Sequence, residues 1–235
     1  MSEKRIFVIN GSPRKRWNTA MMCESFAEGV RSCQVDAEIV HLYDLDFKGC
    51  RSCFACKVKG GRHFGRCAVK DGISDVLDRV ATADGLVLAS PIYFGDLSAG
   101  MRAFAERLLF PYHQYDSGHT TIAPRRFPVT VIYTMNVDEK VAAQKYFDAG
   151  PGTALNLFES FVAHVYSAPK RLCAYDTMQF ADYGRYVSDY FDSAAKAASR
   201  EERFPKDLAA AREAGREMAM AALADGAGMS GQAPR

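Results

Sequence analysis

The feature that most constrains the fold of this chain is a regular alternation of strand-like and helix-like segments. Short runs of β-prone apolar residues recur between longer segments whose apolar positions repeat with a helical period. The predicted strands are 6–9, 34–41, 85–90, 128–135 and a segment within 165–175, and the predicted helices are 18–32, 72–82, 98–109 and 153–163. Alternation of this kind is typical of a parallel sheet with helices on both faces.

Five parallel strands leave few possible connections, because crossovers are right-handed. We expect the flavodoxin-like order 2-1-3-4-5 in a three-layer α/β/α sandwich, with residues 1–224 as one domain. Residues 178–224 are predicted to form a helical extension, and residues 225–235 a flexible tail. Such sheets bind ligands beyond the carboxyl ends of their strands, so the loops after Asn10, Ala89 and Tyr133 are the expected site.

The composition indicates a globular protein that acts on small molecules. Hydrophobic residues make up 48% and charged residues 25% of the chain, which excludes extensive disorder. A formal net charge of +2 argues against nucleic acid or an anionic membrane as the main partner. No apolar run approaches the roughly 18 residues of a membrane span, and no secretory signal pattern is present. We therefore expect a cytoplasmic protein.

The first strand leads into a loop suited to a phosphate. A Gly-Ser-Pro turn ends the strand, and Asn18 begins the next helix. Backbone N–H groups and the positive end of that helix point at one spot. Ser12, Arg14, Asn18 and Thr19 add hydroxyl, guanidinium and amide donors. The loop lacks the Gly-x-Gly-x-x-Gly spacing of dinucleotide sites, which favours a mononucleotide.

The third strand is followed directly by the aromatic loop Ser90-Pro91-Ile92-Tyr93-Phe94-Gly95. Pro91 stiffens the turn, and Gly95 permits close backbone approach. Tyr93 and Phe94 provide large planar rings, which suit the face of a flat aromatic ligand. Packing of these rings on a neighbouring helix or subunit is the alternative. The position of the loop at the same sheet edge as the phosphate loop favours a ligand.

These motifs, in this order and spacing, resemble the NAD(P)H-dependent FMN reductase family, which has the flavodoxin-like fold and includes the iron–sulfur flavoproteins. The resemblance covers roughly residues 4–222, including Asp176–Phe180 and Phe204–Leu208. It implies FMN as cofactor and NAD(P)H as electron donor. By this resemblance, Ser12, Arg14, Asn18 and Thr19 would hold the FMN phosphate, Pro91, Ile92, Tyr93, Phe94 and Gly95 would line the ring and ribityl chain, and Thr134, Met135 and Asn136 would flank the ring.

Four of the seven cysteines, Cys50, Cys53, Cys56 and Cys67, lie within 18 positions. Three thiolates at Cys-x2-Cys-x2-Cys spacing can reach three corners of a cubane cluster. In the iron–sulfur flavoproteins a fourth cysteine completes a [4Fe–4S] centre, but here ten residues separate Cys56 from Cys67, more than in that pattern. Two alternatives remain, a [4Fe–4S] cluster on these four residues or a redox-active or vestigial thiol loop. We favour the thiol loop.

The sequence thus predicts an FMN-dependent NAD(P)H oxidoreductase that passes electrons to a quinone, flavin, nitro compound, metal or protein acceptor. The cofactor carries the chemistry, so no side chain is predicted as a catalytic acid or base. The alternatives are a flavodoxin-like or iron–sulfur electron carrier without NAD(P)H activity, and a binding protein on the same fold. The Tyr- and Phe-rich stretch 180–191 and the long loop 111–126 predict self-association as a homodimer or homotetramer.

Overall fold

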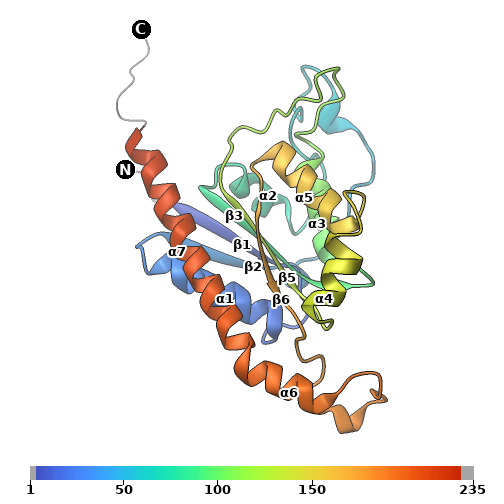
Figure 1. Ribbon diagram of the computed structural model, residues 1–235. Coiled ribbons are helices and arrows are strands. Elements are labelled where there is room, and N and C mark those ends of the chain that lie inside the picture. Colours follow the sequence, from blue (N-terminus) through green and yellow to red (C-terminus); the bar gives the residue numbers. More distant parts are fainter. Residues whose placement is uncertain (1–3, 229–235) are drawn as a thin grey trace.

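A computed structural model describes residues 4–228 and has a parallel sheet at its centre (Figure 1). The parallel strands are β1 (Arg5–Asn10), β2 (Asp36–His41), β3 (Gly85–Tyr93), β5 (Val129–Thr134) and β6 (Lys170–Ala174). Their order is β2-β1-β3-β5-β6, and the two-residue β4 (Asp96–Leu97) pairs antiparallel with the end of β3. Counted over the parallel strands alone, this is the predicted flavodoxin-like order.

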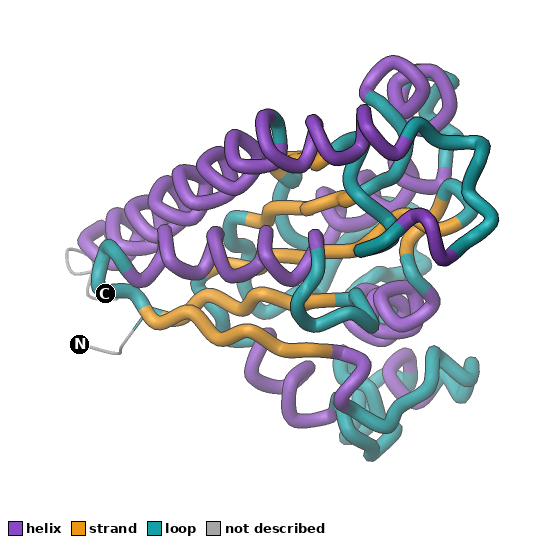
Figure 2. Tube along the Cα trace, turned by 90° about the horizontal axis from the view of Figure 1, so that it is seen from below, coloured by secondary structure: helices purple, strands orange, loops and turns teal. Residues whose placement is uncertain are grey.

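Helices cover both faces of the sheet, which gives the three layers visible in Figure 2. The helices are α1 (Asn18–Arg31), α2 (Ser74–Val80), α3 (Ala99–Leu109), α4 (Glu139–Ala142), α5 (Ala154–Val165), α6 (Ser193–Glu202) and α7 (Phe204–Gly228). Side chains of β1 alternate between two cores: Phe7 and Ile9 pack with α2, α3 and α5, whereas Ile6 and Val8 pack with α1 and α7. This alternation is the two-residue period of a strand that is buried on both faces.

The long C-terminal helix α7 is packed closely onto α1. A β-carbon at Gly29 of α1 would lie 1.9 Å from the carbonyl oxygen of Arg212, and one at Gly215 of α7 would lie 2.1 Å from that of Phe26. Only glycine permits this backbone approach. The contact fixes α7 against the helix that begins at the predicted phosphate loop. Within residues 4–228, no helix is long and apolar enough to cross a membrane.

The structure differs from the sequence prediction after β6. Residues 178–192, predicted as part of a helical extension, are irregular apart from a 3-10 turn at Tyr183–Arg185. Their aromatic side chains pack on one another instead, with the rings of Phe180 and Tyr186 stacked 4.2 Å apart. Asp192 then caps α6 by accepting hydrogen bonds from Ala194 and Ala195.

The boundaries of two other predicted segments also change. Helix α7 continues to Gly228, and the rest of the predicted flexible tail, 229–235, lies outside the described residues. Strand β3 runs on from the predicted 85–90 to Tyr93, because its end pairs with β4. The α4 segment and the π-helical turn Ala143–Phe147 that follows it were not predicted.

Candidate functional site

A cavity of about 350 Å³ lies at the carboxyl ends of the central strands and joins the three predicted loops. Eleven of the twelve residues predicted for a cofactor line it: Ser12, Arg14, Asn18, Thr19, Pro91, Ile92, Tyr93, Phe94, Thr134, Met135 and Asn136. Gly95 does not line it and lies in the turn beside it. A hollow of about 500 Å³ at the amino ends of β5 and β6 contains none of these residues. The expected edge of the sheet therefore carries the candidate site.

One end of the cavity is the N-terminus of α1. The helices α3, α4, α5 and α6 each have a side-chain cap from Ser, Asp or Thr, whereas α1 and the short α2 have none. Asn18, Thr19 and Ala20 of its first turn are buried. No described residue accepts a hydrogen bond from the N–H group of any of these three. Buried, unpaired N–H groups at a helix N-terminus provide a site for an anion.

The loop before α1 is shaped by short polar contacts. Asn10 Oδ1 accepts from the N–H of Ser12 at 2.9 Å, and Ser12 Oγ accepts from the N–H of Arg14 at 3.1 Å. The hydroxyls of Thr19 and Thr134 lie 2.7 Å apart, which connects α1 to the end of β5. The loop is thus held open toward the cavity by its own side chains.

Arg14 brings a positive charge to this end of the cavity. Its guanidinium lies 4.1 Å from the centre of the Trp17 ring, and its partial burial lowers the pKa of Arg14. Lys15 forms an ion pair with Asp44, whereas no carboxylate among residues 4–228 is paired with Arg14. Arg14 is exposed at the edge of the cavity, where a cation without a paired carboxylate favours an anionic ligand.

The other end of the cavity is an aromatic hairpin. Ile92 pairs with Leu97 and Tyr93 with Asp96, so that Phe94 and Gly95 form a two-residue turn. Both turn residues have positive φ, +53° for Phe94 and +80° for Gly95. The left-handed conformation is strained for a bulky residue, and here it leaves the Phe94 side chain fully exposed at the mouth. The hairpin therefore presents two rings to whatever enters the cavity.

Asn136, after β5, provides an unused acceptor at the cavity wall. Its Nδ2 donates to Gln179 Oε1 at 2.7 Å, but its Oδ1 is buried and has no partner. Lys196 of α6 is 3% exposed and donates to the Asn136 carbonyl and to the Asp176 carboxylate. These two contacts of Lys196 fix the loop and leave the buried Asn136 Oδ1 without a hydrogen-bond partner.

Several lining residues were not assigned from the sequence, namely Trp17, Val137, Tyr146, Thr177, Met178, Gln179 and Phe191. Tyr146 comes from the unpredicted turn after α4. Residues 177–179 lie within the Asp176–Phe180 segment, which carries part of the family resemblance. That resemblance is the sequence feature that could have assigned them to the site. Trp17 lies in the predicted loop, but its hydrogen-bond partner, the carbonyl of Met178, is 161 residues away in sequence and could not be predicted.

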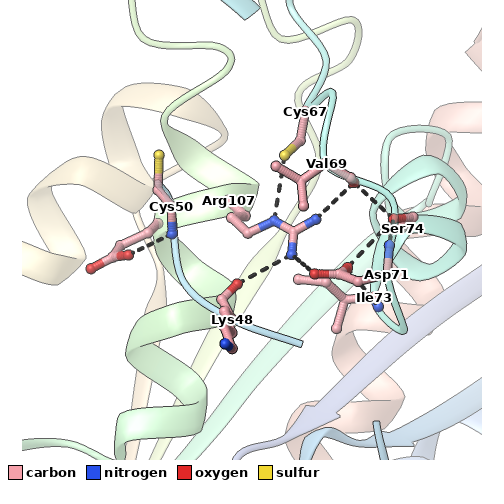
Figure 3. A network of polar contacts seen from close by, with 9 residues as sticks. Lys48, Cys50, Cys67, Val69, Asp71, Ile73, Ser74 and Arg107 are labelled. Atoms are coloured by element: carbon pink, nitrogen blue, oxygen red, sulfur yellow. Dashed lines mark hydrogen bonds and ion pairs between the residues drawn. The ribbon is translucent and has the colours of Figure 1, made fainter. Parts of the chain in front are cut away.

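The four clustered cysteines lie elsewhere, on the loop between β2 and α2. Cys50 and Cys53 are exposed, whereas Cys56 is buried. The N–H of Ala55, and to a smaller extent Arg51, lower the pKa of Cys53, and burial raises the pKa of Cys56. The Cys67 thiol accepts a hydrogen bond at 3.4 Å from Nε of Arg107, a buried residue of α3 (Figure 3).

The structure does not group the four cysteines as a set of metal ligands. Among residues 4–228, no three His, Cys, Asp or Glu side chains are grouped so that they could hold a metal ion. Cys67 is engaged by a guanidinium, and Cys50 and Cys56 differ in exposure. The cluster on Cys50, Cys53, Cys56 and Cys67 therefore remains a prediction from resemblance, and we derive no electron transfer through it.

The chain is similar in sequence to known flavoproteins. The model of the family described as NADPH-dependent FMN reductase matches residues 4–123, just over half of the chain. An iron–sulfur flavoprotein of Archaeoglobus fulgidus is 39% identical over 103 residues, which are 44% of this chain and 48% of that protein. One of Methanocaldococcus jannaschii is 29% identical over 103 residues, 44% and 51% of the two chains. The chain thus spans about half the length of the curated relatives it matches.

Solved structures share the fold at low identity. An NAD(P)H:quinone oxidoreductase from Methanothermobacter marburgensis superposes with a TM-score of 0.66 at 14% identity, over 92% of this chain and 97% of that chain. An FMN-dependent NADH-azoreductase from Bacillus anthracis, solved in complex with FMN, gives a TM-score of 0.59 at 11% identity, over 92% and 99%. These likenesses establish the architecture alone.

Proposed function

Because the chain belongs to the NADPH-dependent FMN reductase family, we propose that it binds FMN in this cavity and acts as an NAD(P)H-dependent oxidoreductase. The observation that carries the proposal is one cavity that joins an uncapped helix N-terminus to an aromatic hairpin. The first suits a phosphate and the second a flat ring. The two ends of the cavity therefore match the two ends of one mononucleotide.

The residues present fit this cofactor. The N–H groups of Asn18, Thr19 and Ala20, together with Ser12 and Arg14, would hold the phosphate. Pro91, Ile92, Tyr93 and Phe94 would line the ring and ribityl chain, with Gly95 forming their turn, and Thr134, Met135 and Asn136 would flank the ring. When bound, FMN supplies hydride acceptance from NAD(P)H and electron transfer to an acceptor. The protein would bind and orient it, and Asn136 would present its amide to the ring.

The proposed acceptor is a quinone, flavin, nitro compound, metal or protein. The competing function is an electron carrier without NAD(P)H activity, which would need no access for a pyridine nucleotide. The exposed Phe94 at the mouth of the cavity favours the reductase, since a solvent-facing ring offers a second ligand a surface to stack on.

Anaerobic stopped-flow mixing of the FMN-loaded protein with NADH or NADPH separates these functions. We expect the flavin absorbance to bleach with at least one of the two nucleotides. Binding of FMN without bleaching by either would favour the carrier. Failure of the purified protein to bind FMN would refute both.

We also propose that the protein self-associates as a homodimer or homotetramer. Val187 and Tyr190 are 99% and 85% exposed, and they lie in the segment that reaches the cavity at Phe191. Exposed apolar residues grouped in this way are typical of an interaction surface. Light scattering coupled to gel filtration should give a multiple of the 25.9 kDa chain mass, and a monomeric mass would contradict the proposal.

A further inference from the structure

The segment that follows β6 runs along the candidate site and is tied to the loop after β5. The N–H and hydroxyl of Thr177 both donate to the carbonyl of Met135, each at 3.0 Å. The N–H of Asp176 donates to the carbonyl of Val137 at 2.8 Å. Residues 177–179 in turn line the cavity. The segment is therefore a wall of the site, although it lies outside the three loops that define a sheet edge.

The first loop holds this wall from the opposite side. Arg14 Nη1 donates to the carbonyl of Gln179 at 2.7 Å, and Trp17 Nε1 donates to that of Met178 at 2.9 Å. Asn18 Nδ2 also donates to the Met178 carbonyl, at 2.8 Å. Two side chains of the loop and the first of α1 thus converge on two adjacent carbonyls that are about 160 residues away in sequence. Arg14 and Asn18 keep further N–H groups, so these bonds are compatible with a bound phosphate.

Arg200 of α6 supports the same contact from outside the cavity. Its Nη1 donates to Asn18 Oδ1 at 2.9 Å, which directs the other end of the amide, Nδ2, toward Met178. Its guanidinium lies 6.0 Å from the centre of the Trp17 ring and 4.4 Å from that of Phe204. Burial lowers the pKa of Arg200, and no carboxylate in the described part of the chain is paired with it. Its guanidinium thus donates to Asn18, the same side chain that donates to the Met178 carbonyl.

We propose that Thr177–Gln179 is a clamp over the bound cofactor, and that Trp17 and Arg200 are positioning residues that keep it closed. Trp17 lines the cavity and acts through Met178, whereas Arg200 lies behind Asn18, outside the lining. The clamp rests on the proposed function, since it can retain only a ligand that the cavity takes. Because residues 177–179 form one wall of the cavity, their release opens the site around any bound flavin, with or without a phosphate. The clamp therefore governs how fast the cofactor leaves.

Trp17→Phe tests the clamp with little change in shape, because it removes the indole N–H and keeps an aromatic ring beside Arg14. Loss of one such hydrogen bond corresponds to a change of about 2- to 10-fold. We expect FMN and riboflavin to dissociate faster from Trp17→Phe by this factor, and by the same factor for both ligands. Dissociation is measured as recovery of flavin fluorescence on dilution. A direct phosphate ligand would instead affect FMN and spare riboflavin, and that result would overturn the clamp.

Arg200→Met tests the supporting residue. We expect it to raise both dissociation rates, with Arg200→Lys restoring them only in part because an ammonium lacks the planar fork. Arg203→Met is the matched control: Arg203 contacts Glu139 and Tyr175 and no residue of the first loop. Its dissociation rates should equal those of the unmodified protein. Equal effects of Arg200→Met and Arg203→Met would overturn the role of Arg200.

Hydrogen exchange of the cofactor-free protein separates failure of the clamp from failure of the proposed function. In Trp17→Phe and Arg200→Met, amides 176–180, including the Thr177 N–H, should exchange faster, while amides of β1 stay protected. Unchanged exchange at 176–180 would overturn the clamp even if FMN binds. If the variants exchange faster at 176–180 but the protein binds no FMN, the proposed function and the retention of FMN are refuted. The contacts that hold residues 177–179 against the first loop are then still supported.

Discussion

Removal of the Arg107 guanidinium should destabilise the protein far more than removal of an exposed arginine. The Arg107 side chain is 1% exposed and donates to four acceptors: the Asp71 carboxylate, the Cys67 thiol and the carbonyls of Lys48 and Val69 (Figure 3). Burial alone would lower the pKa of Arg107, but Asp71 and Cys67 outweigh it and raise the pKa above its ordinary value. Arg107→Met leaves these partly buried acceptors without their donor.

Removing one partner of a buried pair costs about 3 to 5 kcal/mol. With a urea dependence of about 3 kcal/mol per M, the unfolding midpoint of Arg107→Met should fall by roughly 1 to 1.7 M. In a double-mutant cycle, Arg107→Met and Asp71→Asn should be coupled by at least about 1 kcal/mol, since the two residues are in contact. Arg66→Met is the control, because Arg66 pairs with Asp78 at the surface, and its midpoint should hardly move. Similar midpoints for the two arginine variants would refute the reasoning.

Phe94→Gly should leave the free energy of unfolding unchanged or raise it by about 1 kcal/mol, because it relieves a left-handed backbone conformation at an exposed position. The same variant should slow reduction of the bound flavin by NAD(P)H. A clear loss of stability in urea would contradict the first expectation. Lys196→Met should lower the free energy of unfolding by about 2 to 4 kcal/mol and weaken FMN binding in titrations, because the loop at Asn136 loses its contacts with Lys196. Lys206→Met, at an exposed position of α7, should change neither quantity. Burial raises the pKa of Asp207 to about 6, so the folded state binds this proton more tightly than the unfolded state, and stability should fall as the pH rises from about 4 to 6. Asp207→Asn should flatten that part of a urea-midpoint profile against pH, and an unaltered slope would rule out this group.

The sheet and the loops at its edge could be predicted from the sequence, because both depend on local patterns. The continuous apolar run 85–90 indicates a strand buried on both faces, and the Gly-Ser-Pro turn before Asn18 marks where such a strand meets a helix. The sheet order then brings the ends of β1, β3 and β5 together, since these strands are neighbours. Eleven of twelve predicted residues therefore line one cavity, and the role of each in binding FMN remains a proposal.

What the sequence could not predict depends on contacts between distant segments. The sequence around Trp17 does not indicate a role for its indole. That role depends on the carbonyl of Met178, which lies 161 residues later in the chain and accepts the indole N–H. The spacing of the cysteines is equally insufficient as a basis for prediction. It shows which thiols are near in sequence, but not which side chains from other parts of the chain contact them. Arg107 comes from a helix 40 residues beyond Cys67, on a face whose neighbours are the apolar residues Phe104 and Leu108. A cation on an apolar helix face requires buried acceptors, and the cysteine loop supplies them through Asp71, Val69 and Lys48. The arginine thus joins Lys48, Cys67, Val69 and Asp71 in one network, and Cys67 is the clustered cysteine whose thiol takes part in it.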